Sequence, residues 1–171
     1  MRSLLALFAC LALSACGLQP MYAGAGGMSV AQDMAAVEIP AIQGQGGWLV
    51  KNALEDRLGV ARQGAGAPAP RYRLDVRLDD SLEALGVLND DTISRERRIL
   101  RARYQLVDIA SNAILLDATS GSDAGIDVVS SEYATIAAEQ KALENLALSL
   151  ADRMATQIAL ALRRQANVAQ P

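Results

Sequence analysis

The chain has 171 residues, of which 51% are apolar and 20% are charged, and its formal net charge is −3. This length suits one domain with a modest core, and the slight negative charge gives no electrostatic reason to expect nucleic-acid binding. Histidine is absent, which excludes His-dependent catalytic triads, His-ligated zinc and histidine pH switches. Aromatic residues make up only 4% of the chain, which argues against a base-stacking platform.

The N-terminus has the pattern of a secretory signal peptide. Arg2 supplies a positive charge, and residues 4–13 form an uninterrupted apolar run. A membrane-spanning helix needs about 20 such residues, so this run is too short to span. A charge followed by a short apolar core and small residues is typical of a signal peptide. We therefore predict that residues 1–15 are removed and that Cys10 is lost with them.

The predicted cleavage zone reads Leu13-Ser14-Ala15-Cys16 and resembles the lipobox of bacterial lipoproteins. That resemblance implies that a diacylglycerol is attached to the thiol, that cleavage occurs before the cysteine and that the new amine is acylated. Two or three acyl chains hold a protein stably on a membrane, whereas one holds it marginally. Cys16 is therefore the expected lipid anchor, and the alternative is an ordinary signal peptide with an incidental cysteine. Gly17 is compatible with sorting to the outer membrane under the enterobacterial rule.

A tether and a small folded domain are expected to follow. Residues 16–36 are predicted to form a flexible tether after the lipidated cysteine, because they are rich in glycine and show little periodicity. Residues 37–40 look like a short edge strand that Pro40 ends. Residues 48–58 space their apolar side chains as a helix does, and Gly59 stands where a C-capping glycine belongs.

Three further strands are predicted. Over residues 72–79, apolar residues alternate strictly with Arg and Asp, so that one face is buried and the other is wet. Residues 89–91 (Asn-Asp-Asp) mark a turn, and the next strand runs from about residue 92 to 107. Residues 111–112 mark a second turn, and residues 113–118 form the last predicted strand.

The C-terminal part is predicted to be a long amphipathic helix. The secondary structure of residues 119–129 is ambiguous from the sequence. Residues 131–164 contain no Gly or Pro and are dominated by Ala and Leu. Glu132 at the start and arginines at the end suit the helix dipole. Residues 166–171 are expected to fray. The apolar stripe has steps of three and four with one of seven, and consists of Tyr133, Ile136, Leu143, Ala147, Leu150, Met154, Ile158 and Leu162.

The predicted element order is therefore β-α-β-β-β-α. We expect an α+β fold with two layers, in which two helices pack on one face of an approximately four-stranded, mostly antiparallel sheet. An antiparallel sheet with one apolar face can bury that face under two helices. Residues 37–165 are predicted to form this single domain.

The segment Cys16-Gly17-Leu18-Gln19-Pro20-Met21-Tyr22 resembles the CGFQPLY-type opening of the lipopolysaccharide-assembly lipoprotein family LptE, in its alphaproteobacterial form. The segments LVKNALEDRLG and YRLDVRL, the arginine-rich strand and the terminal helix follow in the family's order. The resemblance thus covers most of the mature chain.

This resemblance implies a lipid-anchored protein of the outer membrane whose domain lies on the periplasmic side and inside the LptD β-barrel, as its plug and assembly partner. Together the two proteins would place lipopolysaccharide in the outer leaflet. The resemblance also implies direct lipopolysaccharide binding, no enzymatic activity and no cofactor.

The arginine-rich strand is the ligand-site candidate, and its arginines are Arg95, Arg97, Arg98, Arg101 and Arg103. On an extended strand, all of them except Arg98 have the same parity. Arginine pairs bidentately with phosphates, which lipid A carries, so the functional interpretation is contact with lipopolysaccharide. The alternative is a solvated or barrel-facing surface whose arginines pair with Asp75, Asp79 or the partner.

The family's own lipopolysaccharide contacts are not transferred to this chain. In the family they are basic residues near the hairpin tip and near the start of the last helix. Here the tip reads Asn89-Asp90-Asp91 and the helix begins Ser131-Glu132. If the chain binds lipopolysaccharide, a shifted set of arginines must serve.

No metal site or enzyme is predicted. Residues 117–127 lack the alternate oxygen ligands and final glutamate of a calcium loop. Lys51 and Lys141 are the only lysines, and neither stands in a Ser-x-x-Lys motif. The remaining alternative function is an accessory interaction lipoprotein of another envelope machine, for lipid transport or barrel assembly.

Overall fold

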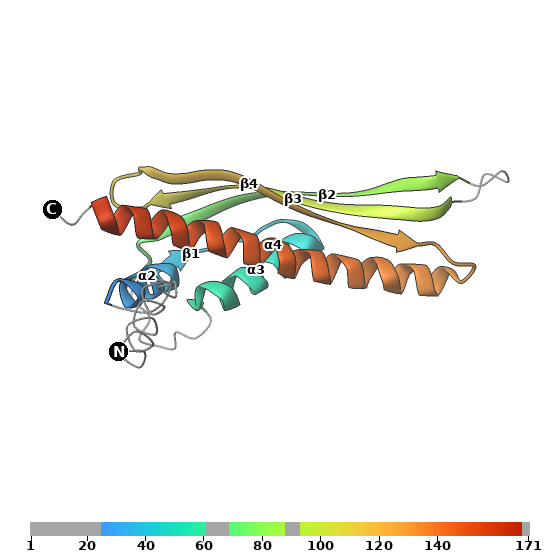
Figure 1. Cartoon of the computed structure of the whole chain (residues 1–171), viewed down its shortest axis with the longest axis horizontal. Helices are drawn as coiled ribbons and strands as arrows, with labels where there is room; N and C mark the ends of the chain where they lie inside the picture. Colours follow the sequence, from blue (N-terminus) through green and yellow to red (C-terminus); the bar gives the residue numbers. More distant parts are fainter. Residues whose placement is uncertain (1–24, 61–68, 88–92, 169–171) are drawn as a thin grey trace, which may run out of the picture.

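The structure is a computed structural model that describes residues 25–60, 69–87 and 93–168. Its elements in chain order are α2 (Ala25–Ala35), β1 (Val37–Glu38), α3 (Gly44–Leu58), β2 (Tyr72–Val87), β3 (Ile93–Asp108), β4 (Ile114–Asp127) and α4 (Glu132–Val168). Figure 1 shows two layers in an elongated molecule, with the sheet on one side and the helices on the other. The predicted α+β class is therefore confirmed, and the described part contains one helix more than was predicted.

The sheet has the strand order β1-β2-β3-β4. The β2–β3 and β3–β4 pairs are antiparallel, whereas β1 runs parallel to β2 and pairs Val37 with Tyr72. This parallel pair follows from the helix α3 between the two strands, because parallel neighbours need a crossover connection. The long β2–β3 pair runs from Tyr72 opposite Asp108 to Val87 opposite Ile93.

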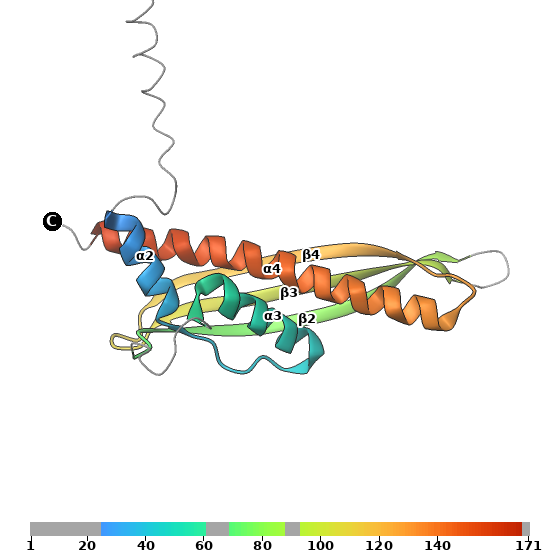
Figure 2. The ribbon, with the colours of Figure 1, turned by 90° about the horizontal axis from the view of Figure 1, so that it is seen from below.

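The core lies between one face of the sheet and the helices. Figure 2 shows α3 and α4 crossing beneath the strands, with α2 at one end. The alternation predicted for β2 and β3 is confirmed, because the even-numbered side chains from Tyr72 to Leu78 and from Leu100 to Leu106 are buried or half-buried against the helices. These buried sheet residues include Tyr72, Leu74, Leu100, Ala102, Tyr104 and Leu106.

The C-terminal part of the predicted tether is helical. Residues 25–35 form α2, and its side chains Val30 and Met34 are 2% and 4% exposed. The helix packs on α4, and the carbonyl of Ala36 just after it accepts a hydrogen bond from Arg71 N at 2.9 Å. Short helices are stabilised by tertiary packing more than by the propensity of their residues. The sequence of α2 therefore needs no strong helical periodicity, and it shows little. Residues 16–24 lie outside the described residues, and so does the predicted turn at 89–91.

Helix α3 begins at Gly44, four residues before its predicted start. A Cβ at Gly47 would lie 2.6 Å from the backbone oxygen of Ile42, so glycine permits a close backbone approach there. The predicted cap is confirmed, because Gly59 has φ 79° and its N–H donates to the carbonyl of Glu55.

Strand β4 is longer than predicted. It continues through most of the ambiguous segment to Asp127, which lies opposite Arg95 of β3. Tertiary pairing overrides the weak strand preference of its small residues. Helix α4 adds support from below, because Arg153 Nη1 donates to the carbonyl of Gly121 at 2.9 Å.

Helix α4 begins close to its predicted start and continues to Val168, into the predicted frayed tail. Its stripe is buried from Leu143 to Leu162, but Tyr133 and Ile136 are 85% and 53% exposed, so their prediction as core residues was wrong. The reason is tertiary, because the first turns of α4 extend beyond the end of α3 (Figure 2).

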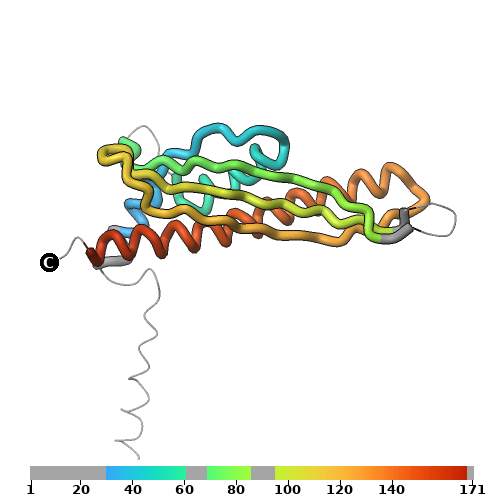
Figure 3. The backbone as a smooth tube through the Cα atoms, turned by 90° about the horizontal axis from the view of Figure 1, so that it is seen from above, coloured from blue at the N-terminus to red at the C-terminus, as the bar shows by residue number. Residues whose placement is uncertain are grey.

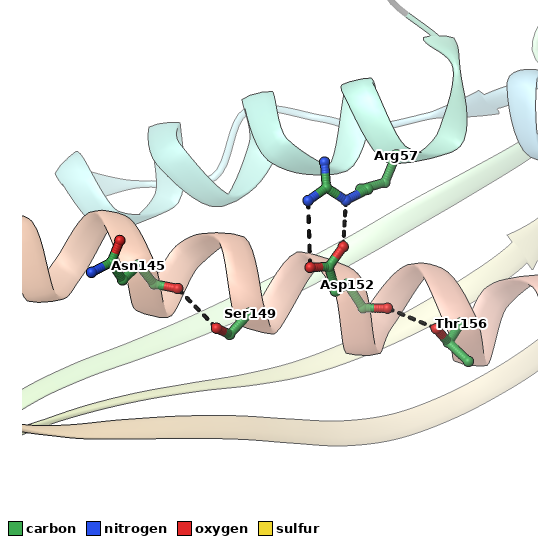
Figure 4. A network of polar contacts seen from close by, with 5 residues as sticks. All are labelled: Arg57, Asn145, Ser149, Asp152 and Thr156. Carbon is green, nitrogen blue, oxygen red and sulfur yellow. Dashed lines mark hydrogen bonds and ion pairs between the residues drawn. The ribbon is translucent and has the colours of Figure 1, made fainter.

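The two longer helices are joined by an ion pair at their surface. Figure 4 shows Arg57 of α3 donating to both carboxylate oxygens of Asp152 on α4. Thr156 Oγ1 donates to the backbone oxygen of Asp152 at 2.9 Å. An exposed pair of this kind contributes little stability.

Candidate functional site

The sheet face opposite the helices is polar, and no described element covers it (Figures 1 and 3). We call this surface the open face. Its side chains come from alternate positions of three strands, and its charged members are Arg73, Asp75, Arg77, Asp79, Glu83, Arg95, Arg97, Arg101, Arg103, Asp117, Asp123 and Asp127. Four of the five arginines predicted to contact a ligand therefore share one surface, as their parity indicated.

The fifth arginine, Arg98, lies on the helix-covered face. Its Nε and Nη2 atoms donate to the two carboxylate oxygens of Asp80 at 2.9 and 2.8 Å. Its Nη1 atom donates to the backbone oxygen of Glu139 on α4 at 3.3 Å. The hydrogen bonds to Asp80 raise the pKa of Arg98 above its ordinary value. Arg98 thus joins β2, β3 and α4 and takes no part in the open face.

Three of the six arginines of the open face pair with acids on the adjacent strands. The N–O distances are 3.4 Å from Arg95 to Asp127, 3.1 Å from Arg97 to Glu83 and 3.2 Å from Arg103 to Asp117. Such exposed pairs are weak, because water screens them. These three arginines are therefore ion-paired, but with other acids than the predicted Asp75 and Asp79.

The two acids that were predicted as partners do not serve these arginines. Asp75 instead accepts from Arg73 Nε, at 3.0 Å, within its own strand. Asp79 lies opposite Arg101 in the β2–β3 register, but no ion pair joins them in the described part of the chain. The choice of partner thus depends on side-chain geometry across the strands.

Arg103 and Asp117 illustrate how the paired charges are held. The hydrogen bond between them raises the pKa of Arg103 and lowers the pKa of Asp117. Gln105 Nε2 adds a hydrogen bond to the same carboxylate at 2.8 Å, which lowers the pKa of Asp117 further. This carboxylate is therefore already satisfied by two donors.

Arg77 and Arg101 are the open-face cations without a partner among the described residues. Arg77 lies directly opposite Arg103 in the β2–β3 register, and like charges in this position repel. An anion bound between them would offset that repulsion. The strict alternation of β2 predicts that Arg77 lies on the solvent-exposed face. The sequence of β2 alone does not identify Arg77 as a site residue, because only the β2–β3 register shows that it lies opposite Arg103.

Two hollows accompany these cations. A cleft of about 510 Å³ lies beside Arg77 and Arg103 and is bounded on its other side by Pro40 and Ile42. A smaller hollow of about 250 Å³ lies over Gly121 beside Arg101. Gly121 has no side chain, and a Cβ there would lie 3.1 Å from Arg101 Cγ, so the missing side chain leaves room for that arginine.

Neither a metal-ligand cluster nor a helix able to span a membrane is found among the described residues. Within residues 25–60, 69–87 and 93–168, no group of three or more His, Cys, Asp or Glu side chains is placed to hold a metal ion. None of the helices in those ranges is both long and apolar enough to cross a membrane. The predicted anchor, Cys16, lies outside the described residues.

Comparison with known proteins agrees with this architecture. A putative lipoprotein from Caulobacter crescentus CB15 is 26% identical, with a TM-score of 0.64, and the match covers 80% of this chain and 97% of that chain. A minor lipoprotein from Acinetobacter baumannii is 17% identical, with a TM-score of 0.53 and coverages of 72% and 88%. The rare lipoprotein B from Shewanella oneidensis is 10% identical, with a TM-score of 0.54 and coverages of 77% and 96%. The last two likenesses show a shared fold alone.

A search of curated protein sequences gives no match. A family model described as LptE: Lipopolysaccharide-assembly matches residues 34–158, from the end of α2 into the last third of α4. The match includes the whole sheet, all of α3 and α4 as far as Ile158, and extends over more than half of the sequence. The chain therefore belongs to the LptE family of lipopolysaccharide-assembly proteins.

Proposed function

We propose that the protein is an outer-membrane lipoprotein that acts as plug and assembly partner of the LptD β-barrel. In this role it takes part in moving lipopolysaccharide to the outer membrane and inserting it into the outer leaflet. The family match over residues 34–158 carries this proposal. The elongated two-layer domain supports it, because a long narrow body with a polar face suits the inside of a large barrel (Figure 1).

Cys16 is proposed as the attachment point, an S-diacylglycerol cysteine with an acylated amine. The lipobox-like segment before it supports this assignment, and the structures similar to this chain are themselves named lipoproteins. Intact-mass analysis of the exported protein tests it. The expected product begins at residue 16 and carries acyl chains, and a bare Cys16 or a retained signal segment would contradict it.

The open face is proposed as the surface that contacts lipopolysaccharide phosphates. Arg101 and Arg77 are the strongest candidates, because neither has a partner in the described chain. Arg95, Arg97 and Arg103 could join them by exchanging an exposed carboxylate for a phosphate. Arg98 is left out, because Asp80 and the carbonyl of Glu139 already occupy its donors.

The decisive experiment is purification of the tagged lipoprotein from its own membranes in mild detergent. We expect a large barrel protein of the LptD type to copurify, and depletion of the lipoprotein to leave lipopolysaccharide in the periplasm or inner membrane. Recovery of a different envelope machine would favour the accessory-lipoprotein alternative. Clean recovery of a lone monomer would contradict the proposal.

A further inference from the structure

The turn between β3 and β4 exposes apolar side chains where polar ones are usual. Ile109 is 39% exposed and Ile114, the first residue of β4, is 57% exposed. Ala110 and Ala113 are exposed as well. Single apolar side chains on a surface are ordinary, but tight turns are normally built from Gly, Asn, Asp, Ser and Pro. This hairpin therefore exposes apolar side chains on both sides of the polar pair Ser111 and Asn112 at its tip.

The turn is also held in one conformation by its own polar groups. The Asp108 Oδ1 atom accepts hydrogen bonds from the backbone N–H and the hydroxyl of Ser111, both at 2.9 Å. Asp108 N donates to the carbonyl of Ala113 at 2.9 Å. Asn112 takes the left-handed conformation, with φ 55°, that asparagine tolerates better than most residues. These polar groups bond within the turn, so the isoleucines are fixed on its outside.

The turn lies at the end of the molecule where the chain enters the fold. In Figures 1, 2 and 3 it shares that end with α2 and with the C-terminus of α4. Arg71 fastens the turn to the residue after α2, because Arg71 N donates to the carbonyl of Ala36 at 2.9 Å and Ile109 N donates to the carbonyl of Arg71 at 3.0 Å.

The chain length before α2 limits how far this end can be from an acylated Cys16. Residues 17–24 alone separate Cys16 from the first residue of α2, and a fully extended chain of that length reaches about 30 Å. The 37 residues of α4 span about 55 Å. A lipid on Cys16 thus keeps the α2 end near the bilayer, whereas the other end of α4 can stand well away from it.

The same end also carries cations. Arg163 and Arg164, near the C-terminus of α4, are exposed, and the side chain of Arg71 is 59% exposed. Among the acids of this end, Asp33 pairs with Arg71 at 3.3 Å and Asp108 is bonded within the turn, whereas Glu38 is exposed. Exposed apolar side chains together with arginines bind the interface of anionic bilayers.

We propose that this end rests on the phospholipid bilayer that carries the anchor, in the lone lipoprotein before it meets its partner. The anchor-end surface consists of Ile109, Ile114, Arg71, Arg163 and Arg164. The isoleucines enter the interfacial region and the arginines contact lipid phosphates, so the long axis of α4 points away from the membrane. This inference rests on the proposed acylation of Cys16 and adds an orientation that the acyl chains alone do not impose.

The test uses the full mature lipoprotein on vesicles of phosphatidylethanolamine and phosphatidylglycerol. Ala110→Cys places a fluorescent label on the turn without removing a side-chain hydrogen bond, and Ser130→Cys places the same label between β4 and α4, at the opposite end. With brominated acyl chains in the vesicles, the label at position 110 should lose most of its fluorescence. The label at position 130 should keep its fluorescence.

A matched pair of variants isolates the apolar contact. Ile109→Ser with Ile114→Ser should abolish the quenching at position 110. Ile136→Ser with Leu148→Ser replaces side chains that are 53% and 46% exposed on α4, and should leave the quenching unchanged. Circular dichroism of each variant should match that of the parent, which shows that the fold is retained.

The possible failures are distinguishable. If the protein floats with the vesicles but the label at position 110 is not quenched, the proposed contact is wrong while the anchor stands. If the protein does not float at all, the anchor is wrong and the contact falls with it. A blue shift that grows with protein density but shows no quenching by brominated lipid would assign the turn to a second copy of the chain and overturn the proposal.

Discussion

Arg98 and Asp80 form a two-pronged ion pair between β3 and β2, with N–O distances of 2.9 and 2.8 Å, beneath the N-terminal part of α4. The two side chains are only 19% and 28% exposed. This is the face of the sheet that the helices cover, so the pair is shielded from water more than the pairs of the open face. A third hydrogen bond, to the carbonyl of Glu139, connects the pair to α4.

Arg98→Ala should therefore destabilise the fold more than loss of an open-face arginine does. The free energy of unfolding should fall by about 1–2 kcal/mol, because the Asp80 carboxylate loses its hydrogen-bond donor in a partly buried site. Urea unfolding of Arg98→Ala and of the control Arg101→Ala measures the difference. Equal stability of the two variants would show that the Asp80 pair does not support the packing of α4.

Gly47→Ala should be strongly destabilising. A Cβ at this position would lie 2.6 Å from the backbone oxygen of Ile42, and backbone cannot move aside cheaply. We expect a loss of about 2 kcal/mol or more in the free energy of unfolding. Gly121→Ala is the control, because its new Cβ would meet the Cγ atom of Arg101 at 3.1 Å, where a flexible side chain can shift. Thermal unfolding of both variants tests the ranking, and an equal effect would refute it.

Charge reversal on the open face should weaken lipopolysaccharide binding without unfolding the domain. Arg101→Glu together with Arg103→Glu removes two cations and adds two acids, and a lost arginine–phosphate contact is worth about tenfold in affinity. The control is Lys51→Glu with Lys141→Glu, which makes the same charge change on α3 and α4, away from both proposed lipid-contact surfaces. Binding of purified lipopolysaccharide is measured beside circular dichroism. Unchanged binding by a folded open-face variant would remove this surface from consideration.

The Asp117 carboxylate should contribute to the acid sensitivity of the protein. Hydrogen bonds from Arg103 and Gln105 hold the pKa of Asp117 below its usual range in the folded chain. A lowered folded pKa stabilises the fold above the unfolded value, near pH 4, and this contribution is lost as the pH falls through the folded value. The free energy of unfolding should therefore fall less steeply below about pH 4 in Asp117→Asn than in the parent. Identical slopes would contradict this role.

Local pattern alone was sufficient for the elements whose signal lies within a few residues. The alternation from Tyr72 to Asp79 identified β2 and its buried face, and Gly59 identified the end of α3, because side-chain period and backbone handedness are local properties. The parity of the β3 arginines likewise separated Arg98 from the other four. The short opening around Cys16 indicated the family, because that motif is contiguous in the chain and depends on no tertiary contact.

Tertiary structure decided what depends on partners distant in the chain. Helix α2 and the second half of β4 are stabilised by packing on α4 and by pairing with β3, so their own residues show little periodicity. Tyr133 and Ile136 follow the apolar stripe of α4 but lie where none of the described helices covers them. Arg77 meets Arg103 only because of the β2–β3 register, which a single strand's sequence does not contain. The sequence by itself therefore determined most elements and their buried faces and indicated the family, because these signals are local, whereas long-range register and packing decided which charges pair and which have no partner among the described residues.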